Sequence, residues 1–163
     1  MNKYLIIIAI VITLFSNSCN NDRIIGEQYL EIPETGWHKD SLVQFSLDIK
    51  DTIHSLNMLF SVKNSEKYSF ANLWLFVSVI SPLGKKHSDT FEIYLADPSG
   101  KWLGKSNWGD YEGKLVYKSA IRFPTSGKYK LLLQQGMRVN NLLGVKKIGV
   151  LLEKNENVQK TSK

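Results

Sequence analysis

Residues 73–80 read Leu-Trp-Leu-Phe-Val-Ser-Val-Ile, and this stretch decides the fold class. β-Branched and aromatic residues dominate it, and such a short apolar run has the length of a strand rather than of a helix. Apolar side chains occupy both sets of alternating positions. We therefore expect a central strand that is covered on both faces.

On either side of this strand, apolar and polar residues alternate with a period of two, which is typical of half-buried strands. The alternation runs through residues 43–49, 58–62, 91–95, 115–123, 129–135 and 147–153. Ser81-Pro82-Leu83-Gly84 and Asp97-Pro98-Ser99-Gly100 have the Pro and Gly positions of type I turns. The pattern predicts an all-β fold: a single antiparallel β-sandwich, jelly-roll or immunoglobulin-like, of about seven or eight strands.

Length and composition agree with one folded domain. The chain has 163 residues, a net charge of +6, 43% hydrophobic residues and 11% aromatic residues. This composition excludes a disordered chain. A single cysteine excludes an internal disulfide, and the absence of a Cys/His cluster leaves no zinc site to propose.

The N-terminus has the features of an export signal. Residues 4–15 carry no charge, follow Lys3, and as a helix would span roughly 18 Å, which is too short to cross a bilayer. Ser16-Asn17-Ser18-Cys19 resembles a bacterial lipobox, which implies cleavage before Cys19 and its acylation. The alternative is a plain secretory signal followed by an incidental free thiol.

The sequence divides into four predicted segments. These are a lipoprotein signal peptide (1–18), a lipidated tether (19–26), the β-sandwich domain (27–154) and a polar basic tail (155–163). Lipoproteins of this kind that are sent to the cell surface usually carry a run of acidic residues directly after the acylated cysteine. This tether has one Asp and then Arg23 instead. We therefore expect a membrane-anchored protein of the cell envelope that faces the periplasm.

No residue pattern marks a reaction centre. His38, His54 and His87 are far apart, and the chain has no nucleophile elbow, zinc-protease, P-loop or dinucleotide motif. The carboxylate pairs that could serve a glycosidase are Asp89 with Glu92 and Asp110 with Glu112, and no spacing marks them out. The sequence predicts no enzyme, no catalytic residue, no metal, no cofactor and no small-molecule substrate.

Residues 97–114 form the least ordinary segment, a glycine-rich connection that contains Trp102, Trp108 and Tyr111. Long connections often carry function, and exposed aromatic residues anchor protein interfaces. We therefore predict a partner contact formed by these three residues and Arg138. The alternative is that Trp102 and Trp108 close the end of the sandwich core. Nucleic acid is an implausible partner for an exported protein, so the basic residues are interpreted as solvated charge.

Two local motifs add detail. Residues 125–131 resemble a tyrosine corner, in which the Tyr129 hydroxyl would bond to nearby backbone, although Thr125 stands where Asp is usual. The alternative is an ordinary hairpin turn. The Asp-Ser-Leu and Asp-Thr-Ile triplets at Ser41 and Thr52 resemble a signal for O-glycosylation in Bacteroidetes, and so short a motif also arises by chance.

Longer blocks of sequence resemble the gliding-motility lipoprotein family GldH of Bacteroidetes. They are residues 68–77, 89–92, 95–105, 122–124, 127–129 and 134–138, of which Leu95–Lys105 is the most specific. The resemblance implies a cell-envelope lipoprotein that is needed for gliding motility and is associated with the machinery that secretes and moves surface adhesins. It implies no known catalytic activity and no known cofactor.

The interpretation that combines these observations is a non-enzymatic structural or assembly lipoprotein. It would attach to the membrane through acylated Cys19 and contact other envelope or gliding lipoproteins. The alternative is a glycan-binding β-sandwich lipoprotein, which requires Trp or Tyr rings in an exposed row with polar groups beside them.

Overall fold

The computed structural model describes residues 23–155, and this part of the chain contains eleven strands and no helix. The strands are β1 (Ile24–Glu31), β2 (Trp37–His38), β3 (Val43–Ile49), β4 (Leu56–Ser65), β5 (Asn72–Ile80), β6 (Lys86–Tyr94), β7 (Lys105–Asn107), β8 (Asp110–Ile121), β9 (Gly127–Gln135), β10 (Asn141–Leu142) and β11 (Val145–Lys154). Eight of them have seven residues or more, so the predicted all-β fold is confirmed. Residues 23–155 contain no helix that could span a membrane.

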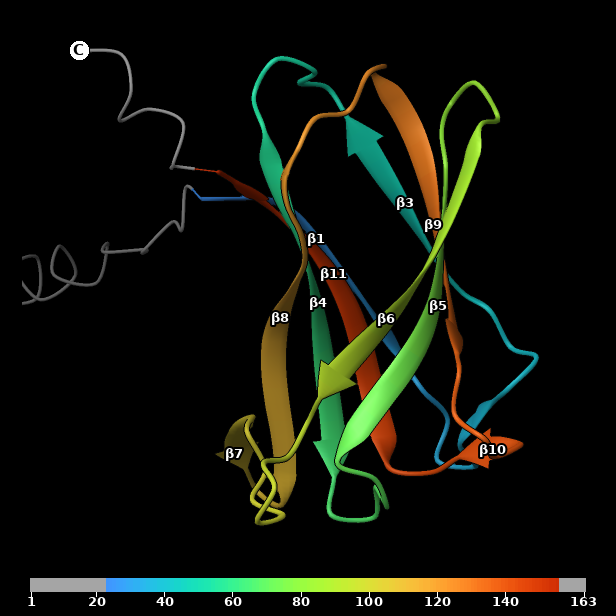
Figure 1. Cartoon of the computed structure of the whole chain (residues 1–163), viewed down its shortest axis with the longest axis vertical. Coiled ribbons are helices and arrows are strands. Elements are labelled where there is room, and N and C mark those ends of the chain that lie inside the picture. Colours follow the sequence, from blue (N-terminus) through green and yellow to red (C-terminus); the bar gives the residue numbers. More distant parts are fainter. Residues whose placement is uncertain (1–22, 156–163) are drawn as a thin grey trace, which may run out of the picture.

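The strands form two main sheets, seen in Figure 1 with β8, β4 and β11 in one layer and β3, β9 and β5 in the other. The five-stranded sheet has the order β1-β11-β4-β8-β7, and the four-stranded sheet has the order β3-β9-β5-β6. β2 and β10 form a small separate pair. Every pairing is antiparallel, as the sequence predicts.

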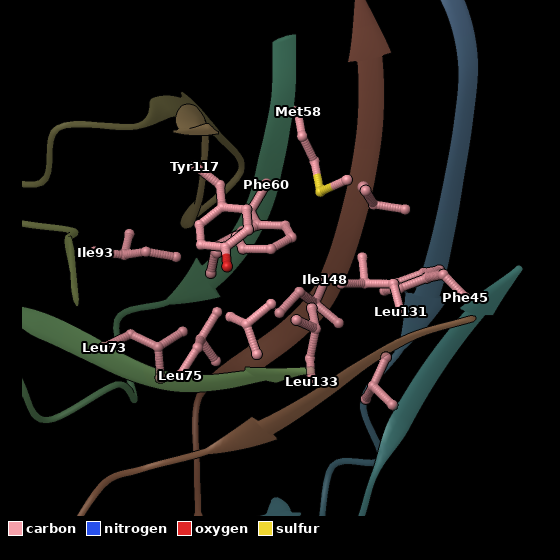
Figure 2. Packing of buried hydrophobic residues seen from close by; sticks show 14 of the residues in the cluster. Phe45, Met58, Phe60, Leu73, Leu75, Ile93, Tyr117, Leu131, Leu133 and Ile148 are labelled. Atoms are coloured by element: carbon pink, nitrogen blue, oxygen red, sulfur yellow. The ribbon is translucent and has the colours of Figure 1, made fainter. Parts of the chain in front are cut away.

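The core fills the space between the two sheets. Figure 2 shows Phe45, Leu131 and Leu133 from the four-stranded sheet pointing toward Phe60 and Ile148 from the five-stranded sheet. All five side chains are buried. Along β3 and β9 buried residues alternate with exposed or partly buried ones, so the period-two pattern identified the core side of these two strands correctly. β4 and β11 instead are buried at five consecutive positions, so alternation does not mark their core side.

Turn chemistry also follows the prediction. The amide of Gly84 donates to the Ser81 carbonyl at 2.9 Å, and the amide of Gly100 donates to the Asp97 carbonyl at 2.9 Å. The Tyr129 hydroxyl donates to the Thr125 carbonyl at 2.9 Å, so the predicted tyrosine corner is confirmed.

The expectation that residues 73–80 are covered on both faces is wrong. Leu73 and Leu75 point into the core and are fully buried, whereas Trp74 and Phe76 point outward and are 38% and 50% exposed. The reason is that the four-stranded sheet packs against one other sheet only, and residues 23–155 form no third layer over its outer face.

The first strand also differs from the predicted segment boundary. β1 begins at Ile24, inside the stretch expected to be tether, and Ile24 pairs with Glu153 of β11. Exposed and partly buried residues do not alternate regularly along this edge strand, so the period-two signal is weak there. Residues 1–22 and 156–163, including Cys19, lie outside the described part.

Candidate partner-contact site

The glycine-rich segment 97–114 folds into a tight turn followed by a hairpin. The Asp97 carboxylate accepts hydrogen bonds from the Ser99 hydroxyl at 2.6 Å and from the Ser99 and Lys101 amides at 2.8 and 3.0 Å. The hydroxyl contact is the main reason that the pKa of Asp97 is lowered. Ala96 and Trp102 then form an isolated antiparallel β-bridge. After it, β7 pairs with β8 in a hairpin that turns at Trp108-Gly109. The segment expected to be one long connection therefore contains a strand of its own.

Trp102 closes part of the core. Its ring is partly buried and lies 5.5 Å from the Tyr111 ring and 6.4 Å from the Tyr68 ring, measured between centroids. Tyr68 is itself buried, and its hydroxyl donates to the Asn72 carbonyl at 2.7 Å. Trp102 therefore takes the position that the core-closing alternative describes.

Trp108 has the opposite environment. It is 99% exposed at the tip of the β7–β8 hairpin. Its φ of 51° and the φ of 81° at Gly109 are both positive, as in a two-residue type I′ turn. Asn, Asp or Gly normally occupies such positions, because a bulky side chain in this region of φ is strained by about 1–2 kcal/mol. A tryptophan here is favoured neither by the turn nor by burial.

Ion pairs fix the hairpin to the rest of the five-stranded sheet. The Asp110 carboxylate lies 2.7 Å from Lys146 Nζ and 3.2 Å from Lys63 Nζ. Contact with Lys146 first, and with Lys63 second, lowers the pKa of Asp110. The hairpin that presents Trp108 is thus held at its base by charges from β11 and β4.

Arg138 lies apart from the hairpin. It is exposed in the connection between β9 and β10, and Figure 1 shows β7 and β10 at opposite sides of the same end of the sandwich. The neighbouring Met137 places its sulfur 3.3 Å from the Trp74 amide. The predicted contact set therefore divides between two places, with Arg138 beside β5.

The candidate carboxylates of a hydrolase serve other contacts. Asp89 pairs with Lys118 Nζ at 2.6 Å, and Glu112 accepts from the Ser61 hydroxyl at 3.0 Å. An Asp51–His54 contact of 2.6 Å, not anticipated from sequence, lies in an exposed loop. Within residues 23–155, no group of three or more His, Cys, Asp or Glu side chains could hold a metal ion.

Sequence reasoning missed the exposed aromatic residues of the four-stranded sheet. Trp74, Phe76 and Tyr94 are 38%, 50% and 58% exposed on its outer face. In the sequence, Trp74 and Phe76 lie within an uninterrupted apolar run. Such a run is typical of a strand buried on both faces, and it also occurs in a strand whose outer face is an exposed apolar surface. No signal in the sequence separates the two cases.

A model of the family described as GldH lipoprotein matches residues 24–152, which is nearly all of the sandwich. The chain belongs to the GldH lipoprotein family. A gliding motility lipoprotein GldH homolog of Christiangramia forsetii is 41% identical over 154 residues, which cover 90% of this chain and 92% of that protein. The gliding motility lipoprotein GldH of Flavobacterium johnsoniae is 32% identical over 158 residues, which cover 93% and 96%. The family resemblance seen in the sequence is confirmed.

Solved structures show only a distant likeness to this GldH-family chain. A family GH115 4-O-methyl-alpha-glucuronidase aligns with a TM-score of 0.40 and 12% identity, over 82% of this chain and 18% of the enzyme. Dimeric latent PorU from Porphyromonas gingivalis aligns with a TM-score of 0.34 and 10% identity, over 82% and 13%. Such values assign no shared activity.

Proposed function

We propose that this GldH-family chain is a non-enzymatic component of the cell envelope that supports gliding motility and the associated machinery for adhesin secretion and movement. Acylated Cys19 holds it to the membrane, and it works by contacting other envelope or gliding lipoproteins. Trp108 carries the proposal, because it is a fully exposed tryptophan in a strained backbone conformation. Tryptophan is a preferred anchor of protein interfaces.

The two ends of the sandwich suit this role. At the tether end, β1 begins at Ile24 and pairs with the end of β11, and β8 ends at Ile121 near Leu56. At the far end, β8 begins at Asp110 beside the Trp108 turn. The twelve residues of β8 span roughly 35 Å. Trp108 is therefore presented at the end of the domain away from the anchor.

Crosslinking in intact envelopes tests the proposal. The full acylated protein would be compared with Trp108→Asn, in which Asn suits the turn, and with Ile53→Asn, a change of a 75% exposed apolar residue at the tether end. We expect Trp108→Asn to remain at normal level in the membrane while its crosslinks to envelope proteins and cell movement on glass fall at least fivefold. Ile53→Asn should change neither. Unchanged crosslinks and movement in Trp108→Asn would overturn the proposal.

The proposed periplasmic orientation has a separate test. The tether lacks an acidic run, which supports a protein that stays inside the outer membrane. Protease added to intact cells should therefore leave the chain whole, whereas protease added after the outer membrane is permeabilised should degrade it. Degradation in intact cells would show that the chain faces outward.

A further inference from the structure

We infer that the outer face of the four-stranded sheet is a second docking surface, and that its occupant is another protein with an acidic border around an apolar centre. We call this surface the aromatic face and define it by Trp74, Phe76, Tyr94 and Leu132. The inference rests on the proposed function in one respect, namely that the chain acts through protein contacts.

The register of the strands places these side chains on one surface. Phe76 pairs with Thr90 of β6 and with Gln134 of β9, and Leu132 is two residues before Gln134 on the same side of the sheet. Trp74 is two residues before Phe76 and lies diagonal to Tyr94. Because side chains at i and i+2 share a face, the three aromatic rings and Leu132 are neighbours.

The aromatic face remains open to solvent. Trp74, Phe76 and Tyr94 are 38%, 50% and 58% exposed, although Leu73, Leu75 and Val77 on the opposite side of β5 are buried. Single exposed apolar residues are normal, whereas a contiguous group of large ones marks an interaction site. The sheet lacks a covering layer at this place within residues 23–155.

The kinds of residue favour a protein over a glycan. Trp, Tyr, Phe, Met and Arg are the types enriched in protein interfaces. Sugars also stack on aromatic rings, and Thr90 and Gln134 lie opposite Phe76, but Phe76 and Leu132 at the centre offer only apolar surface, which a sugar ring with its hydroxyl groups matches poorly. Arg138 follows Met137 directly, so the predicted contact residue lies at the edge of this face.

Charge indicates which kind of protein fits. Lys86, Lys128 and Lys130 lie at outward positions of the same sheet, with Lys39 and Arg138 in adjoining loops. None of these five cations has an ion pair in the part of the chain that the structure describes. In contrast, every ion-paired Lys or Arg there lies on or just before a strand of the five-stranded sheet: Arg23, Lys63, Lys118, Lys146 and Lys147.

These five cations outnumber the carboxylates in the same places, which are Asp48 and Glu92 on the outward side of the sheet and Asp40 in the loop beside Lys39. A partner with acidic residues around the apolar contact would neutralise them, whereas a second copy of this chain would place like charges opposite one another. The observations therefore favour an acidic partner protein over self-association.

Site-specific photo-crosslinking tests the inference in living cells. A photoreactive phenylalanine analogue is placed at position 90, which faces outward opposite Phe76, and at position 116, which is outward on the five-stranded sheet. We expect position 90 to crosslink to a different protein, with the adduct mapped by mass spectrometry to a segment rich in Asp and Glu. Position 116 should give no such adduct.

Two double variants examine the two halves of the claim. Trp74→Thr with Phe76→Thr should lower the adduct yield at position 90 at least tenfold, and Lys128→Glu with Lys130→Glu at least fivefold. Lys114→Glu, on the other sheet, should have no effect. All of these residues are at least partly exposed, so thermal midpoints should stay within a few degrees of the parent protein.

Several results would overturn the inference. They are no adduct at position 90, an adduct with a second copy of this chain, an adduct with polysaccharide, or a yield that neither double variant reduces. The proposed function has its own readout, because Trp108→Asn should leave the position-90 adduct in place. If Trp108→Asn does not reduce the crosslinks to envelope proteins while the position-90 adduct forms as expected, the proposed contact at Trp108 is wrong and the inference about the aromatic face is still supported.

Discussion

At the scale of single residues, Trp108 is a residue whose proposed role in binding conflicts with the stability of the fold. Its φ of 51° is a conformation that Asn or Gly adopts at lower energy, and its 99% exposed ring contributes little to folding. A residue that costs stability at its position, and yet is large and apolar, is typical of binding sites. We interpret the strain as the consequence of presenting a ring at a hairpin tip.

The first prediction concerns this strain. Trp108→Asn should raise the free energy of unfolding by about 0.5–1 kcal/mol, because Asn-Gly is a favoured type I′ sequence. Chemical denaturation of the acylated protein in detergent measures the change. Trp102→Asn is the contrast, since it removes a partly buried ring and should destabilise the domain. A lower stability for Trp108→Asn would show that the indole packs against the domain.

At the scale of elements, the entry of β11 into its sheet depends on a close approach between its backbone and the connection from β4 to β5. Gly144 precedes β11 with a φ of +85°, and a Cβ at this position would overlap the Tyr68 amide nitrogen. The Ser65 amide donates to the Gly144 carbonyl at 2.8 Å, which joins this entry to the end of β4. The connection from β4 to β5 and the start of β11 are thus packed backbone against backbone.

A pair of glycine substitutions measures this packing. Gly144→Ala should destabilise the domain by about 3–4 kcal/mol, through both the positive φ and the overlap with backbone. Gly84→Ala has a similar φ of +79° but open space around the new methyl group, so about 1 kcal/mol is expected. The difference between the two thermal midpoints isolates the close approach. Equal effects would contradict it.

The β7–β8 hairpin should show a dependence on pH that comes from Asp110. Because Lys146 and Lys63 lower the pKa of Asp110 in the folded protein, its ion pairs stabilise the fold above the ordinary carboxyl pKa of about 3.9. This contribution is lost as the pH falls through the lowered pKa. Asp110→Asn should therefore cost about 1 kcal/mol at neutral pH.

The difference between Asp110→Asn and the parent protein should shrink in acid, as the parent carboxylate becomes protonated. Urea denaturation at several pH values between 2 and 7 measures it. Ser119→Asn, an exposed change on β8 that removes no charge, should track the parent protein throughout. A stability difference that does not vary with pH would exclude the ion pairs as its cause.

At the scale of the whole molecule, the proposed anchor and the proposed contacts lie in a defined order. Arg23 is four residues after Cys19, a distance of at most about 14 Å when fully extended. In the proposed arrangement the tether end is therefore close to the bilayer, while the β7–β8 hairpin lies at the other end of the sandwich and β5 and β6 run along its side (Figure 1). Anchoring raises the local concentration of such surfaces, so individually weak contacts are sufficient.

Loss of the anchor should abolish the function without unfolding the domain. Cys19→Ala is expected to remove labelling by radioactive palmitate and to shift the chain from the membrane to the soluble fraction, since the acyl chains supply the membrane affinity. Its thermal midpoint should match that of the parent domain. Palmitate labelling that persists in Cys19→Ala would contradict Cys19 as the acylation site.

Features that depend on local pattern could be predicted from the sequence. Alternation identified the inward positions of strands such as β3 and β9, and Pro and Gly positions identified the turns at Ser81 and Asp97. The motif around Tyr129 predicted a bond from its hydroxyl to nearby backbone, which the structure shows at the Thr125 carbonyl, and the block at residues 95–105 indicated the family. These features are local because a side-chain period or a turn needs only neighbouring residues.

Where alternation is missing, only the tertiary structure shows which apolar residues are covered. Burial depends on which strands pack together, and the apolar run of β5 gave no indication that Trp74 and Phe76 would lack a cover. The same holds for Trp102 and Trp108, six residues apart, where contacts with Tyr68 and Tyr111 hold one ring against the core while the hairpin turn exposes the other. Such outcomes follow from contacts between distant segments, which no local pattern records.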